Sequence, residues 1–140
     1  MKLTDCRETK AEVYRLESLL ERLKVLSESC PQVQYDGMPR SRSRKSPVEA
    51  VAVKICDVEN QLESARRRLV EQQAELTEKI FRCCHNSTTA EILCMRYVQF
   101  QPFKKIAAEL NYSEQNIFVH HKRGVDSFKA VADTGAAAAV

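Results

Sequence analysis

The sequence predicts an all-α protein, in which a long N-terminal helical hairpin or coiled coil is followed by a C-terminal bundle of shorter helices. Three observations indicate this class. The 140 residues include only three glycines and four prolines, so the turns that a β-sheet needs are scarce. Apolar residues recur at spacings of three and four, as they do along one side of a helix. The chain is 44% hydrophobic and 29% charged, which is typical of a folded protein.

The first predicted helix covers about residues 2–28. Its apolar side chains follow a 3-4-3 spacing with two further leucines beside it, and charged residues fill the other faces. The apolar positions are Val13, Leu16, Leu20 and Leu23, with Leu19 and Leu26 widening the stripe.

A basic linker is expected at residues 30–46, because Pro31, Gly37 and Pro39 interrupt any helix there and the composition cannot bury a core. This segment carries four basic side chains and one acidic one. Two interpretations of the basic residues stay open: a solvated flexible linker, or an arm that binds phosphate groups. The residues concerned are Arg40, Arg42, Arg44 and Lys45.

The second predicted helix begins at Pro47, where Ser46 and Glu49 form a capping box. Its apolar residues repeat as 3-4-3-4 over more than three heptads, which indicates a supercoiled seam. They are Val48, Val51, Ile55, Val58, Leu62, Ala65, Leu69, Leu76 and Ile80, with a polar slot at Gln72 and Gln73. Such a seam needs a partner, either the first helix in an antiparallel hairpin, a second subunit, or both. Residues 1–84 are therefore expected to form a helical arm.

A second domain is expected at residues 86–131. Thr88 and Glu91 offer a capping box for a helix over about residues 89–100, and Pro102 starts a helix of two turns. Asn111 tolerates the left-handed conformation of a tight turn. Ser113 then caps a last helix that runs from Glu114 to about Val131, and residues 132–140 are expected to form a flexible tail.

The two C-terminal helices have the spacing of a helix-turn-helix. Apolar residues stand where the helices would cross, and Ala107 supplies the small side chain of the closest approach. The inward face of the last helix holds Ile117, His121, Gly124 and Phe128, whereas Gln115, Phe118, Val119 and Lys122 form a second stripe that we expect to face a DNA major groove. The predicted DNA-binding residues are Lys104, Lys105, Ser113, Glu114, Gln115, Phe118, Val119, Lys122 and Arg123.

The stretch LCMRYVQFQPFKKIAAELNYSEQNIFVHHKRGVDSF resembles sigma-factor region 4, and more closely the phage-encoded regulators of the ArpU and RinA type. The matching positions are Leu93, Arg96, Tyr97, Ile106, Ala107, Leu110, Tyr112, Ser113 and Ile117. Asn111 replaces the usual glycine, and Lys104 and Lys105 replace an acidic pair. The resemblance implies a sigma-region-4-like fold and a promoter-binding regulator of phage or prophage genes that works on double-stranded DNA and contacts RNA polymerase.

The charge distribution agrees with such a partner. The net charge is only +3, but residues 93–131 carry six basic and three acidic side chains, whereas residues 1–29 carry six of each. The heptads indicate a homodimer formed through the coiled coil, which would place two recognition helices on neighbouring half-sites.

Other classes of function have weaker support. No nucleophile, carboxylate pair or phosphate loop indicates an enzyme, and no cofactor is expected. The six cysteines, among them the adjacent Cys83 and Cys84, lack the spacing of a metal site. They are interpreted as reduced thiols of a cytoplasmic protein. No apolar run is long enough for a membrane span.

Two alternatives to the regulator stay open. The first is a phage terminase small subunit, which also joins a helix-turn-helix to oligomerising helices. The second is a protein-interaction module that binds RNA polymerase or another host protein without DNA.

Overall fold

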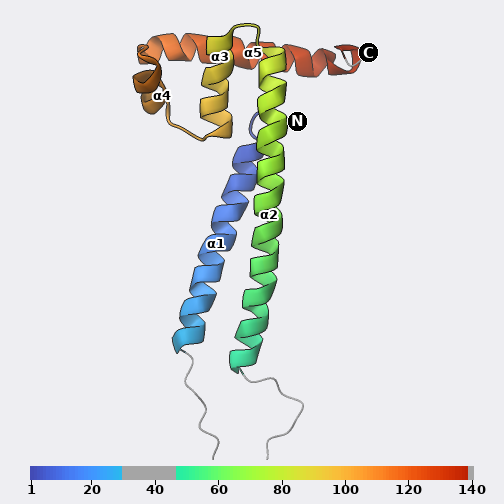
Figure 1. The fold of residues 1–140 in the computed structure, drawn as a ribbon, viewed down its shortest axis with the longest axis vertical. Helices are drawn as coiled ribbons and strands as arrows, with labels where there is room; N and C mark the ends of the chain where they lie inside the picture. The colour runs from blue at the N-terminus through green and yellow to red at the C-terminus, as the bar shows by residue number, and fades with distance from the viewer. Residues whose placement is uncertain (30–46, 139–140) are drawn as a thin grey trace, which may run out of the picture. The chain divides into compact units, whose positions relative to one another are not determined.

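The computed structural model describes residues 1–29 and 47–138, with side chains up to Val131 (Figure 1). Every element in these ranges is helical, so the predicted all-α class is confirmed. The elements are α1 (Asp5–Ser29), α2 (Pro47–Cys83), α3 (Ser87–Leu93), the π-helical segment η1 (Cys94–Val98), α4 (Phe103–Leu110) and α5 (Glu114–Ala138). The predicted basic linker, with Arg40, Arg42, Arg44 and Lys45, lies outside the described residues, as does the proposed cap Ser46.

The contacts divide the chain into two compact units. One consists of residues 10–68, and the other of residues 1–9 together with residues 69–140. Both α1 and α2 therefore contribute to both units. α2 begins at Pro47, as the sequence predicts, because the fixed φ of proline suits the first position of a helix.

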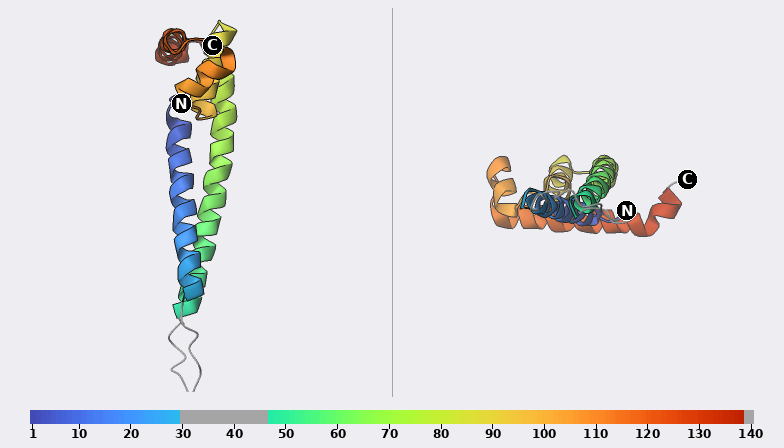
Figure 2. Two further views of the ribbon diagram at one scale, coloured as in Figure 1. Left: turned by 90° about the vertical axis from the view of Figure 1, so that its left-hand side faces the viewer. Right: turned by 90° about the horizontal axis from the view of Figure 1, so that it is seen from below.

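In the unit of residues 10–68, the two helices form an antiparallel hairpin, and they lie side by side in both Figure 1 and the left view of Figure 2. Its seam buries five of the predicted apolar residues: Val13, Leu16, Val58, Leu62 and Ala65. Two ion pairs flank the seam, Arg66–Glu17 at 2.8 Å and Arg68–Glu12 at 2.6 Å. Between 38% and 58% of each of these side chains is exposed, so the pairs contribute little to stability.

Two residues that were expected to belong to the apolar face of α1 are exposed, so the expectation is wrong at these positions. Leu19 and Leu26 are exposed to solvent by 43% and 54%, although they were expected to widen the apolar face of α1. Two helices that pack along one seam cover only a narrow strip of each other. Side chains that lie beside this strip therefore stay accessible.

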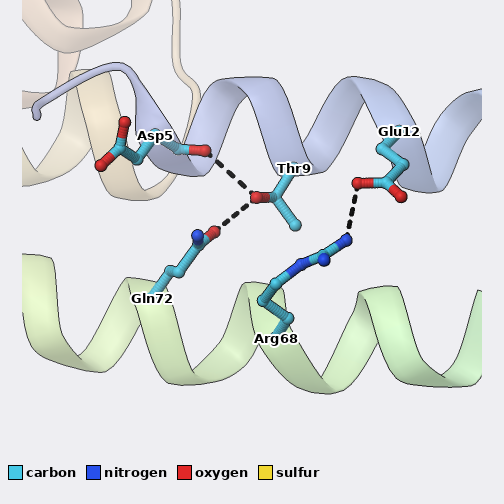
Figure 3. A network of polar contacts seen from close by, with 5 residues as sticks. All are labelled: Asp5, Thr9, Glu12, Arg68 and Gln72. Carbon is cyan, nitrogen blue, oxygen red and sulfur yellow. Dashed lines mark hydrogen bonds and ion pairs between the residues drawn. The ribbon is translucent and has the colours of Figure 1, made fainter. Parts of the chain in front are cut away.

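In the other unit, the start of α1 packs against the second half of α2. The buried Thr9 hydroxyl donates a hydrogen bond to Oε1 of Gln72 at 2.5 Å, and it lies 3.2 Å from the carbonyl oxygen of Asp5 (Figure 3). The surrounding core of this part is apolar, with Leu3, Cys6, Leu69, Leu76 and Ile80 all buried. Gln72, one of the two polar residues that interrupt the heptads of α2, is thus paired with the polar Thr9 of α1.

In place of the single helix expected at residues 89–100, the structure has α3 (Ser87–Leu93) followed by η1 (Cys94–Val98). Asn86 is the N-cap of α3, because its side-chain oxygen accepts a hydrogen bond from the Thr88 N–H at 2.9 Å. The expectation that Thr88 caps this helix is therefore wrong. After Leu93 the backbone widens into η1, where the Gln99 N–H donates to the Cys94 carbonyl at 3.0 Å.

A side chain of α2 forms a hydrogen bond with the π-helical segment η1. The side-chain amide of Gln73 donates to the Val98 carbonyl at 2.8 Å, which satisfies an acceptor at the end of η1. The chain then turns sharply at Phe100, whose φ is 59°. Arg96 stabilises the exit by donating to the Gln101 carbonyl at 3.2 Å.

The α4–α5 connection follows the sequence prediction closely. Asn111 adopts the left-handed conformation with φ 58° and ψ 38°, and its N–H donates to the Ala107 carbonyl. The Ser113 hydroxyl accepts a hydrogen bond from the Asn116 N–H at 3.2 Å, so it caps α5. α5 continues to Ala138 rather than ending at about Val131. The alanines at its end have the highest intrinsic helix propensity.

One apolar cluster joins α3, η1, α4 and α5. It contains Ile92, Met95, Ile106, Ala107 and Ile117, with Phe103 and Leu110 packed against it. α5 crosses α3 (Figure 1). Gly124 lies at the contact between them, because a β-carbon added there would lie 2.8 Å from side-chain atoms of both Thr89 and Leu93. The lack of a side chain at Gly124 permits this close crossing.

Candidate nucleic-acid interface

The stripe predicted on α5 is exposed. Gln115, Phe118, Val119 and Lys122 are all accessible, whereas Ile117, Gly124 and Phe128 on the other side of the helix are buried. The 3.6-residue period of the helix produces this division, because residues at spacings of three, four and seven share one face. The recognition stripe, meaning Gln115, Phe118, Val119 and Lys122, thus combines an amide, a cation and two apolar side chains on one surface.

Phe118 has a structural role as well as an exposed edge. Its ring packs edge-on against Phe103 with ring centroids 5.0 Å apart, yet 47% of the residue remains accessible. Phe103 is in turn covered by the Arg96 guanidinium, 4.3 Å from the ring centroid. The sequence did not predict the Phe103–Phe118 contact, since it depends on how α4 lies against α5.

The predicted phosphate-binding residues occupy two helices. Lys104 and Lys105 lie in the first turn of α4, and Arg123 lies on α5 beside Lys122; all four are exposed. The ion pairs found within residues 1–29 and 47–131 involve Arg66, Arg67, Arg68 and Arg82. None of them involves these four cations, which therefore remain available to an anionic partner.

The predicted site also contains one acidic residue. Glu114 is exposed at the first position of α5, where its negative charge interacts favourably with the helix dipole. Ser113, which precedes it, is occupied as the cap of the helix. These two residues therefore serve mainly to start α5, and the surface predicted to contact bases begins at Gln115.

Behind the stripe, His121 connects three elements. Its Nε2 lies 2.7 Å from the Tyr97 hydroxyl, the two rings stack at a centroid distance of 5.6 Å, and the Phe103 ring meets it edge-on at 5.0 Å. Burial, and then the nearby Arg96 charge, lower the pKa of His121. Burial is also the main cause that raises the pKa of Tyr97. The expectation that His121 lies on the inward face of the last helix is confirmed, since it is partly buried against Tyr97 and Phe103.

The cysteines of this region are buried thiols. Cys83, Cys84 and Cys94 are all buried, and desolvation, followed by the charges of Cys84 and Glu91, raises the pKa of Cys94 to about 11. In the part of the chain that the structure describes, no cluster of three or more His, Cys, Asp or Glu side chains is arranged to hold a metal ion. Cys83, Cys84 and Cys94 lie in the described core, where a buried thiol packs much as a small apolar side chain does.

Comparison with protein-family models, curated proteins and solved structures gave no match for the chain. The resemblance to sigma-factor region 4 and to the ArpU and RinA regulators thus stays a prediction from the sequence. None of the described helices has the length and apolar character required to span a membrane.

Proposed function

We propose that the protein is a sequence-specific DNA-binding transcriptional regulator of phage or prophage genes, with α4 and α5 acting as a helix-turn-helix. The observation that carries the proposal is the exposed recognition stripe on α5, directly after a turn formed by Asn111 and a cap formed by Ser113. Buried Ile106, Ala107 and Ile117 hold α4 against α5 behind this stripe. A recognition helix needs both a rigid base and an exposed polar face.

The chemistry of the stripe suits the edges of base pairs. The Gln115 amide can both donate to and accept from adenine, and Lys122 can donate to guanine or to a phosphate group. Val119 and the accessible edge of Phe118 offer apolar contacts to a thymine methyl group. Lys104, Lys105 and Arg123 would contact phosphate oxygens on either side of the groove, which positions the protein without reading sequence.

A homodimer is part of this proposal. Because the hairpin already buries Val58 and Leu62 within one chain, a second subunit would pack on side chains that remain exposed on α1 and α2, namely Leu19, Val25, Leu26, Val48 and Val53. RNA polymerase as a further partner, and a cytoplasmic location, are proposed on the same resemblance that implies a promoter-binding regulator.

Fluorescence anisotropy tests the proposal, with promoter DNA from the same genome titrated at several salt concentrations. We expect Gln115→Ala to reduce discrimination between specific and unrelated DNA by about 1–3 kcal/mol, because a bidentate base contact is lost. Lys104→Ala or Arg123→Ala should instead weaken binding to every sequence and reduce the salt slope by about one unit. Lys24→Ala, which removes an exposed cation from α1, is the matched control and should leave binding unchanged.

The alternatives give different results in the same assay. If the wild-type chain shows no saturable DNA binding even at low salt, the regulator proposal fails and the protein-interaction module takes its place. If DNA binding is found but the protein assembles into a large ring, as measured by sedimentation or mass photometry, the terminase small subunit is favoured.

A further inference from the structure

A cleft of about 450 Å³ opens in the unit formed by residues 1–9 and 69–140. Met1, Leu3 and Thr4 line it from the start of the chain, Tyr97 from η1, and Val125 and Phe128 from α5. None of these residues belongs to the recognition stripe. The volume falls within the range of roughly 300–1,000 Å³ that is usual for small-molecule sites.

The floor of the cleft is apolar and well supported. Leu3 and Phe128 are buried, and the Phe128 ring is fixed from one face by the Lys79 ammonium group, 5.6 Å from its centroid. The Tyr97 hydroxyl is already hydrogen-bonded to His121, so Tyr97 offers the cleft mainly its ring. An occupant must therefore be largely hydrocarbon.

The remaining lining residues give the cleft a positive charge. Lys2 and Lys129 line it and are exposed, and neither takes part in the ion pairs of the described residues. No acidic residue is among the eight that line it. The nearest acidic group on the same segment is Asp5, whose carboxylate accepts a hydrogen bond from the Lys2 backbone N–H at 2.8 Å. An apolar floor with two lysines at its edge complements an anionic headgroup on an alkyl chain.

We propose that this cleft binds a single-chain amphiphile with a carboxylate headgroup, such as a medium-chain fatty acid. The alkyl chain lies against Leu3, Val125 and Phe128, and the carboxylate contacts Lys2 and Lys129. The proposal goes beyond DNA binding and does not depend on it, because ligand binding is measured on the protein alone.

Isothermal titration calorimetry of the full chain tests this site with three ligands of equal chain length, namely octanoate, octan-1-ol and octylammonium, all below their micellar concentrations. Octanoate should bind most tightly and octylammonium most weakly. From hexanoate to decanoate, affinity should rise about fourfold for each added methylene group that is buried. Equal affinity for the three headgroups, or no saturable binding of any carboxylate, would overturn the proposal.

Two variants locate the ligand. Lys129→Gln should weaken octanoate roughly two- to fivefold and leave octan-1-ol unchanged, since an exposed ion pair contributes little energy. Val125→Phe fills the cleft and should abolish binding of both, with its melting curve recorded to establish that it folds. Lys24→Gln is the control for charge at a position outside the lining. Octanoate binding that is unaffected by both Lys129→Gln and a folded Val125→Phe would place the ligand elsewhere and refute the proposed site.

Discussion

The Tyr97 hydroxyl lies 2.7 Å from Nε2 of His121, across the contact between η1 and α5. When Nε2 carries no proton, the tyrosine donates to it, and the two stacked rings are both partly buried. Protonation of the imidazole would place a positive charge in this partly buried site and close to Arg96; burial first, and then the Arg96 charge, lower the pKa of His121. The packing of α5 on η1 is therefore linked to the protonation state of one side chain.

Stability should consequently fall in mild acid. Because burial, and then Arg96, hold the pKa of His121 below its ordinary value of 6.5, the unfolded chain binds this proton more readily than the folded one. The contribution of neutral His121 to the free energy of unfolding is fully present above pH 6.5. It is lost as the pH falls through the lowered pKa of the folded state. Urea unfolding between pH 7.5 and pH 5 should show this decline, and His121→Gln should flatten it. His85→Gln, at an exposed histidine, should retain the wild-type slope.

The crossing of α3 and α5 should not tolerate a side chain at Gly124. A β-carbon there would lie 2.8 Å from both Leu93 Cδ1 and Thr89 Cγ2, well inside van der Waals contact. Gly124→Val should therefore cost about 1–3 kcal/mol of unfolding free energy through overpacking. Ser127→Val, at an exposed position of the same helix, should stay within about 0.5 kcal/mol of wild type. Equal stability of the two variants in thermal unfolding would contradict the close crossing.

The hairpin seam should be sensitive to charge at Leu62. This side chain is only 5% exposed, so Leu62→Asp would bury a carboxylate without a partner. We expect a loss of about 3–5 kcal/mol, comparable to that of breaking a buried ion pair. Circular dichroism melts would measure it, and Ser64→Asp on the exposed side of α2 is the matched control. If both variants melt as the wild type does, the seam is assigned incorrectly.

Cysteine labelling should separate buried from exposed thiols. Since the thiolate is the reactive form and the pKa of Cys94 is raised to about 11, hardly any of this thiol is ionised at pH 8. Iodoacetamide should modify the exposed Cys56 at least about tenfold faster than Cys94. Peptide mapping by mass spectrometry measures both rates in one sample, and denaturation in urea should remove the difference. Comparable rates in the folded protein would show that Cys94 is accessible.

The features that the sequence predicted well depend on local backbone chemistry. Pro47 begins α2, Asn111 takes the left-handed turn, and Ser113 caps α5, because each needs only its own conformational preference and its near neighbours. Exposure of Gln115 and Lys122 followed from the helical period in the same way.

The features that the sequence did not predict arise from contacts between distant residues. The π-helical segment ends on a hydrogen bond from Gln73, which lies 25 positions earlier, and hydrophobic spacing contains no sign of it. Phe118 packs on Phe103 only because α4 folds back onto α5. Asn86 and Thr88 are both able to cap a helix, and the choice of Asn86 depends on where α2 ends.

The hydrogen bond between Thr9 and Gln72 favours one register of α1 on the second half of α2. If α1 slid by one heptad along α2, Thr9 would face Ala65 or Lys79 in place of Gln72, and the hydrogen bond from the Thr9 hydroxyl to the Gln72 side chain, worth about 0.5–1.5 kcal/mol, would be lost. Leucine and isoleucine pairs alone would discriminate poorly between such alignments, because each heptad resembles the next. This hydrogen bond thereby fixes the position of the first residues of the chain along α2. Leu3 and Thr4 line the cleft, so the shape of the cleft depends on the Thr9–Gln72 pair, although neither residue of that pair lines it.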